Sequence, residues 1–155
     1  MRRLIIVLTA AAVIAVPLHA QAPQPDAQAT QHPVNQSGVQ GRIDFTQVAG
    51  GLLVTGTASG LQPSVGRYVS LVYDIGSVPG GPTACEPTAP IPGMFVGIWA
   101  VDAMGNGILI QLAPPGAIAP LSVIDTISIR DTAVNGGFGV EAVVACGQIA
   151  VREGR

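Results

Sequence analysis

The chain has no lysine, only two cysteines, few aromatic residues and few charges. Of its 155 residues, 10% are charged and 4% are aromatic, and the seven residues counted as Lys or Arg are all arginine. Proteins bind nucleic-acid backbones with clustered Lys and Arg, so this composition argues against a nucleic-acid partner. The apolar fraction of 48% is nevertheless enough for one domain with a core.

Long apolar runs and sustained helical periodicity are both missing after the first twenty residues. Twenty glycines and thirteen prolines instead divide the chain into short apolar runs. Turn residues recurring every eight to twelve positions or so are typical of an all-β sandwich or barrel. We therefore expect an all-β fold.

Residues 1–20 have the pattern of a signal peptide. Arg2 and Arg3 precede an apolar stretch, residues 4–18, and Ala20 precedes a polar segment. The apolar stretch is shorter than the roughly 20 residues that a membrane span needs. We expect cleavage after Ala20, a periplasmic or secreted location, and no stable membrane span in the mature chain. Loss of the two arginines would change the formal charge from −2 to −4.

The remaining chain divides into a tether and one folded domain. Residues 21–37 are rich in Gln, Ala and Pro and are predicted to be a disordered tether that contains His32. The domain is predicted to span residues 38–152. Period-two patterns predict strands at the following segments: 39–46, 52–58, 67–74, 95–103, 108–112, 121–130 and 140–151. The Asn106-Gly107 step predicts a hairpin, and the three prolines of 113–120 predict a crossover.

These segments predict a Greek-key β-sandwich or flattened barrel of seven or eight strands. Residues 75–93, with five prolines and four glycines, are expected to form a long irregular loop. Two cysteines in an exported chain are expected to pair, so we predict a Cys85–Cys146 disulfide. It would close a loop of about 60 residues, worth roughly 4 kcal/mol at most.

Four stretches, in order along the chain, resemble the Cu/Zn superoxide dismutase family. Residues 38–47 read GVQGRIDFTQ, and the family's first strand usually has the pattern V-x-G-x-I-x-F-x-Q. Residues 56–61 read GTASGL and are similar to a G-x-I-x-G-L step. Residues 96–97 are the VG that precedes a family hairpin, and 145–149 read ACGQI beside the family's A-C-G-V-I. The resemblance implies a dismutase-like fold, with the final-strand cysteine bridged to the long loop.

The metal ligands that the resemblance implies are missing. Residues 65–70 read VGRYVS where the family has H-G-F-H-V-H, which puts Tyr68 and Ser70 at two copper-ligand positions. Ile98 occupies the position where the resemblance implies a carboxylate, and Arg130 occupies the position where it implies a histidine. Copper favours imidazole ligands, and zinc binds His, Cys or carboxylate. Because these four positions carry none of those side chains, we expect no metal site and neither copper nor zinc as a cofactor.

The sequence therefore favours a non-catalytic binding or structural module of the cell envelope, with an unidentified protein or envelope partner. One alternative is a divergent superoxide dismutase acting in superoxide detoxification, and whether the chain is an enzyme is left open. A second alternative is a secreted sandwich of only generic similarity, such as an adhesin-like module. A homodimer is a further possibility, because the open edges of a sandwich can pair.

Two other groups of residues are candidate sites. Arg130 and Asp131 could bind an anion, but the simpler alternatives are a surface ion pair or an arginine that caps loop carbonyls. Tyr68 and Ser70 share one strand face and could form a nucleophile pair. A nucleophilic serine needs a base, however, and the predicted domain has no histidine to supply one.

Overall fold

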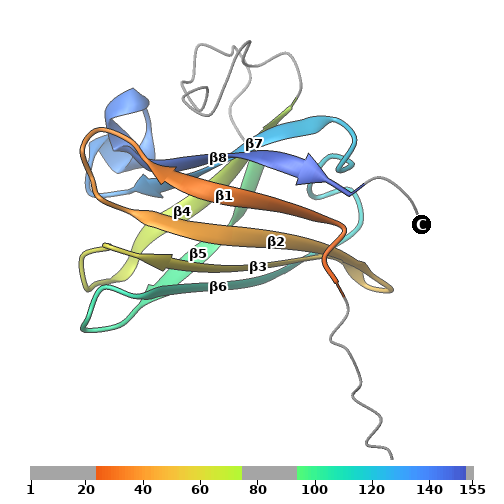
Figure 1. Ribbon diagram of the computed structural model, residues 1–155, viewed down its shortest axis with the longest axis horizontal. Helices are drawn as coiled ribbons and strands as arrows, with labels where there is room; N and C mark the ends of the chain where they lie inside the picture. The colour runs from red at the N-terminus through yellow and green to blue at the C-terminus, as the bar shows by residue number, and fades with distance from the viewer. Residues whose placement is uncertain (1–23, 75–93, 153–155) are drawn as a thin grey trace, which may run out of the picture.

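The structure, a computed structural model, describes residues 24–74 and 94–152, and this part of the chain is an antiparallel β-barrel (Figure 1). Two short 3-10 helices, η1 (Asn135–Gly137) and η2 (Val140–Ala142), lie between the last two strands. The eight strands are β1 (Ala27–Pro33), β2 (Gln40–Val48), β3 (Gly51–Ser59), β4 (Val65–Asp74), β5 (Met94–Val101), β6 (Gly107–Ala113), β7 (Ile124–Asp131) and β8 (Val143–Val151). No helix in the described ranges is long and apolar enough to cross a membrane.

The strands close into a barrel in the order β1-β2-β3-β6-β5-β4-β7-β8. The connections β3–β4 and β6–β7 join strands that are not neighbours, which confirms the crossover predicted for residues 113–120. β4 and β5 are neighbours, so residues 75–93 link adjacent strands. The all-β prediction is confirmed. The proposed signal peptide and the long-loop prediction lie outside the described residues.

The N-terminal tether was predicted wrongly. Residues 27–33 form β1, which pairs with β2 on one side and with β8 on the other (Figure 1). Ala27, Ala29 and Gln31 point into the barrel and are at most 1% exposed. Inward and outward side chains do alternate along this strand. The inward residues are two alanines and a glutamine, however, so the hydropathy of successive residues hardly alternates. The barrel thus begins eleven residues before Gly38, the predicted start of the domain.

β1 also leaves the sheet without the open edges of a sandwich. β1 joins the two outermost strands, β2 and β8, so the sheet closes on itself. Closure leaves a barrel without the free first and last strands of an open sandwich. The edge-to-edge dimer suggested by the sequence therefore has no edge of that kind to use.

The interior is filled from all eight strands. The fully buried interior side chains are Ala27, Ala29, Ile43, Phe45, Val54, Val72, Trp99, Leu109, Ile127, Ile129 and Ala145. Trp99 is the largest of them, and its Nε1 donates a hydrogen bond to Ser70 Oγ at 2.9 Å. A β-carbon at Gly56 would lie 2.8 Å from Trp99 Cη2, and one at Gly107 would lie 3.0 Å from Cε3. Glycine at these two positions makes room for the indole.

The predicted β5–β6 hairpin forms, but not by the expected mechanism. Gly105 is the residue with positive φ (83°), whereas Asn106 is not in that region. Asp102 Oδ1 accepts hydrogen bonds from the backbone nitrogens of Met104 and Asn106, both at 2.8 Å. A carboxylate that accepts from backbone N–H groups two and four residues later stabilises the turn.

Substitution of Ala29 by Glu should destabilise the protein by more than about 3 kcal/mol, because the new carboxylate would be buried without a partner. Thr30→Glu is the matched control, because the neighbouring Thr30 is exposed. The comparison is made by urea unfolding monitored by circular dichroism. Equal stability of the two variants would mean that β1 is not part of the barrel wall.

Candidate functional site

Two of the positions that the resemblance matched to metal ligands lie inside the barrel. Tyr68 is 3% exposed, and its hydroxyl accepts a hydrogen bond from the backbone nitrogen of Gln62 at 3.0 Å. Ser70 has no exposed surface, and its Oγ is the acceptor for Trp99. The prediction that Tyr68 and Ser70 share one face is confirmed, and that face is the core. The Tyr68 hydroxyl therefore holds the connection between β3 and β4, and the Ser70 hydroxyl holds the buried tryptophan.

The other two positions lie on the outside. Ile98 of β5 and Arg130 of β7 are both register partners of Val69, which lies between Tyr68 and Ser70 on β4. Successive side chains of a strand point to opposite faces, so Val69, Ile98 and Arg130 lie on the outer face. Ile98 is 55% exposed, while Arg130 is covered. The four predicted positions thus do not converge on one point.

Arg130 is buried and holds the segment that follows β7. It is 2% exposed, and its Nη1 donates to the carbonyl oxygens of Gly137 at 2.8 Å and Gly139 at 2.9 Å. Among the alternatives considered from the sequence, capping of loop carbonyls is confirmed. The surface ion pair is wrong for Arg130, because none of the described carboxylates lies within salt-bridge distance of it.

On its other side, the Arg130 guanidinium donates hydrogen bonds to two hydroxyls that the sequence did not predict as partners. Its Nε donates to Tyr73 Oη at 2.9 Å and to Ser128 Oγ at 3.3 Å, and its Cζ lies 5.9 Å from the centre of the Tyr73 ring. Tyr73, Ser128 and Arg130 form a buried polar layer on the outside of the barrel. The polar alternation of Thr126, Ser128 and Arg130 is a signal that could have identified this row. Tyr73 could not have been found without the β4–β7 register.

Asp131 pairs with Arg67 rather than with its neighbour Arg130. Arg67 Nε and Nη2 donate to the two carboxylate oxygens of Asp131 at 2.7 and 2.6 Å, a bidentate arrangement. This hydrogen bonding from Arg67 lowers the pKa of Asp131 and outweighs the opposing effect of burial. Arg67 also accepts, through its backbone oxygen, from Thr132 N at 2.8 Å and Thr132 Oγ1 at 2.7 Å. The start of the 132–142 segment is therefore anchored to β4.

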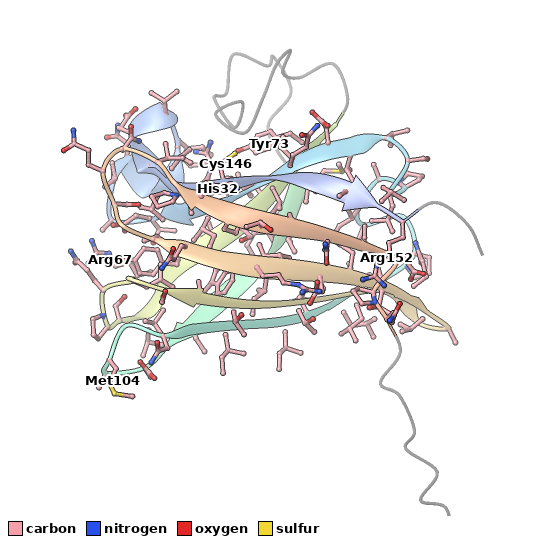
Figure 2. All side chains as sticks on the ribbon, viewed as in Figure 1. His32, Arg67, Tyr73, Met104, Cys146 and Arg152 are labelled. Carbon is pink, nitrogen blue, oxygen red and sulfur yellow. The ribbon has the colours of Figure 1, made fainter. Side chains whose placement is uncertain are left out.

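Cys146 lies on the outer side of β8. It has no exposed surface and belongs to a small cluster with Val143 and Val34, separate from the barrel interior. Its register partners are His32 on β1 and Ser128 on β7, and Figure 2 shows Cys146, His32 and Tyr73 on the same side of the barrel. Cys85 lies outside the described residues, so the pairing of the two cysteines stays a prediction.

His32 was expected in a disordered tether and instead lies on β1, where it is exposed. It lines a shallow groove of about 690 Å³ that crosses the ends of β1, β2, β3 and β6. The lining carries no charged residue and consists of Thr30, Gln31, His32, Pro33, Gln40, Gly41, Thr57, Ala58, Ser59, Asn106, Gly107 and Ile108. The groove is lined by four neighbouring strands, and β6 lies beside β3 without following it in sequence, so single-strand patterns did not reveal it.

Gln31 is an unusual residue beneath this groove. It is 1% exposed, and both atoms of its side-chain amide have no hydrogen-bond partner. Its Nε2 lies close over Gly147, where an added β-carbon would be only 2.7 Å away. An unsatisfied buried amide costs about 1–3 kcal/mol. Gln31 is thus a polar side chain in the barrel wall whose amide none of the described protein groups satisfies.

Comparison with family models and with curated proteins identifies no relative. The sequence matches no model of a protein family, and no curated protein matches it. Within the described residues, no group of three or more His, Cys, Asp or Glu side chains is placed to hold a metal ion.

Replacement of Arg130 by Met should destabilise the protein by about 1–3 kcal/mol, because the carbonyls of Gly137 and Gly139 would lose their donor. Amide hydrogen exchange in residues 132–142 should accelerate more than exchange in β2 or β3. The control is Arg42→Met, which removes a pair whose arginine side chain is 51% exposed and should cost less than about 1 kcal/mol. Equal effects of the two substitutions would contradict the role assigned to Arg130.

The Arg67–Asp131 pair should make stability depend on pH. The folded-state pKa of Asp131 lies below its ordinary value of 3.8, so its contribution is complete above that value and is lost as pH falls through the folded-state pKa. Asp131→Asn should lower stability at pH 7 by about 1–3 kcal/mol and weaken the loss on acidification. Thermal unfolding between pH 7 and pH 2 tests this, with Asp44→Asn as the surface control. An Asp131→Asn profile parallel to that of the wild type would contradict it.

Proposed function

We propose that this chain is an exported, non-catalytic binding or structural module of the cell envelope, built on a Cu/Zn superoxide dismutase-like barrel. The observation that carries the proposal is the use made of Tyr68 and Ser70. At the two positions that the resemblance pairs with copper ligands, both side chains point into the core and hydrogen-bond to Gln62 and Trp99. Side chains committed to the interior serve the fold, and a ligand placed there would have to displace core packing.

The strand arrangement supports the fold part of the proposal. β4, β5 and β6 are consecutive neighbours, and β7 returns beside β4, giving the order β7-β4-β5-β6 that defines a Greek key. Cu/Zn superoxide dismutase is among the families that share the sandwich architecture. The stretches that resemble the family lie on β2, β3, β5 and β8. One departure is that residues 38–47, which resemble a first strand, fall on and just before the second strand here.

Cys146 lies in a small cluster outside the barrel interior, so a disulfide to Cys85 would not have to enter the core. A disulfide between Cys85 and Cys146 would tie residues 75–93 to β8 beside the polar layer of Tyr73, Ser128 and Arg130. Disulfides persist in oxidising compartments, which agrees with a periplasmic or secreted location.

Metal analysis of the mature chain tests the proposal. The chain is expressed with its N-terminal segment, recovered from the periplasm of a host supplied with copper and zinc, and measured by mass spectrometry and by superoxide decay. We expect no stoichiometric copper or zinc and no acceleration of superoxide decay. Stoichiometric copper with activity would overturn the proposal in favour of a divergent superoxide dismutase.

Peptide mapping of the same preparation without reduction should find Cys85 linked to Cys146. Two free thiols, or a bridge between chains, would remove the main covalent support for the dismutase-like frame. The chain would then be better described as a secreted sandwich of generic similarity.

A further inference from the structure

The groove that contains His32 runs across the barrel wall, from β1 over β2 and β3 to β6 (Figure 1). Gly41 on β2 pairs with Gln31 on β1 and with Ala58 on β3. Ala58 pairs in turn with Gly107 on β6. The side chains of Gln31 and Ala58 point into the barrel, so this row presents its main chain to the outside. The row is therefore the floor of the groove.

The walls of the groove are outward side chains on either side of this row. Successive residues of a strand point to opposite faces, so the residues before and after each floor position point outward. One wall carries Thr30, Thr57 and Ile108, and the other carries His32, Gln40, Ser59 and Asn106. Apart from Ile108, the walls thus present hydroxyl, amide and imidazole groups.

Most of these polar groups have no partner within the protein. Within residues 24–74 and 94–152, the following wall side chains make no hydrogen bond: Thr30, His32, Gln40, Thr57 and Ser59. The charged neighbour Arg42, by contrast, donates from its Nε to Asp44 Oδ1 at 2.7 Å. The groove therefore offers neutral donors and acceptors, while the charge beside it is already paired.

The charge of the groove restricts its ligand. None of the lining residues is charged, and the whole chain has a formal net charge of −2. An anionic ligand would find no cation in the lining, and a cationic ligand would find no carboxylate there. A charged group that loses water without gaining a partner is unfavourable. The groove therefore favours an uncharged ligand.

The direction of the groove favours a sugar over an extended peptide. A bound peptide strand adds to the edge of a sheet and lies along it. This groove instead crosses strands whose backbone groups are paired with one another in ladders. A peptide here would have to satisfy its own backbone from side chains alone. Sugar hydroxyls both donate and accept, and hydroxyl, amide and neutral imidazole side chains can answer either role.

We propose that this groove binds a neutral oligosaccharide whose hydroxyls hydrogen-bond to both walls. Pro33 and Ile108 supply apolar contact for the carbon–hydrogen faces of the sugar rings. The volume of about 690 Å³ lies in the range of roughly 300–1,000 Å³ that is usual for small-molecule sites. The proposal rests on the proposed binding role and names its ligand class. The two can fail separately, because the metal and superoxide measurements do not involve this groove.

Titration of the isotope-labelled protein with neutral oligosaccharides, followed by backbone amide chemical shifts, tests the site. The probes are cellohexaose, maltohexaose, mannohexaose and chitohexaose. With at least one probe, amides of 30–33, 40–41, 57–59 and 106–108 should shift, with a dissociation constant on the order of 1 mM or lower. The constant should be the same at low and high salt, because no charges pair. If none of the four probes shifts these amides, the proposal is overturned.

Thr57→Val removes one hydroxyl from a wall, and Thr55→Val is the matched control. Thr55 lies two residues earlier on β3, points to the same outer face and does not line the groove. Thr57→Val should raise the dissociation constant by about 2- to 10-fold, the effect of one hydrogen bond, and Thr55→Val should leave it unchanged. Adding Gln40→Ala, which removes a group from the opposite wall, should weaken binding further. Circular dichroism of each variant verifies folding.

Two outcomes would assign the groove differently. Equal effects of Thr57→Val and Thr55→Val would overturn the proposal, because the saccharide would then bind elsewhere. An uncharged peptide of Ser and Gln that shifts the same amides more strongly than every saccharide would also overturn it, and would make the groove a peptide site.

Discussion

The structure depends on the closure of one sheet by its first strand. β1 hydrogen-bonds to β2 on one side and to β8 on the other, so residues near both ends of the chain meet in a single ladder. Ala27 pairs with Phe45 and with Val151, and this places the small inward side chains of β1 over the core. Without this strand, the backbone groups of β2 and β8 would be open to solvent. The buried tryptophan lies inside a wall that β1 completes.

Inside the barrel, apolar packing stabilises the structure, whereas outside it buried charged side chains do so. Arg130 binds the carbonyls of Gly137 and Gly139, while Arg67 holds Asp131 at the start of the same segment. Arginine suits both tasks because its planar guanidinium carries several donors in fixed directions. The 132–142 segment is thus fixed to β4 and β7 by side chains from two adjacent strand ends. Cys146 lies in the same region. A covalent link to this cysteine would therefore stabilise the same outer part of the barrel as the two arginines do.

Sequence patterns predicted the strands that have strong alternation and missed the one that lacks it. Ile43 and Phe45 alternate with polar residues, so β2 could be predicted, whereas Ala27, Ala29 and Gln31 differ too little from their neighbours in hydropathy. Period two placed Tyr68 and Ser70 on one face but could not say whether that face was inside or outside, because the answer depends on barrel closure. The partners of Arg130 could not be predicted either. Two of them are loop carbonyls, and Tyr73 is brought near by the β4–β7 register.

The enclosure of Trp99 has a practical consequence. It is the sole tryptophan, it has no exposed surface, and its indole touches the walls formed by β3, β4 and β6. The fluorescence of this side chain therefore reports the polarity at the centre of the barrel without any introduced label. Water that enters as the strands separate would shift the emission to longer wavelength, so barrel opening can be followed optically in the unmodified protein.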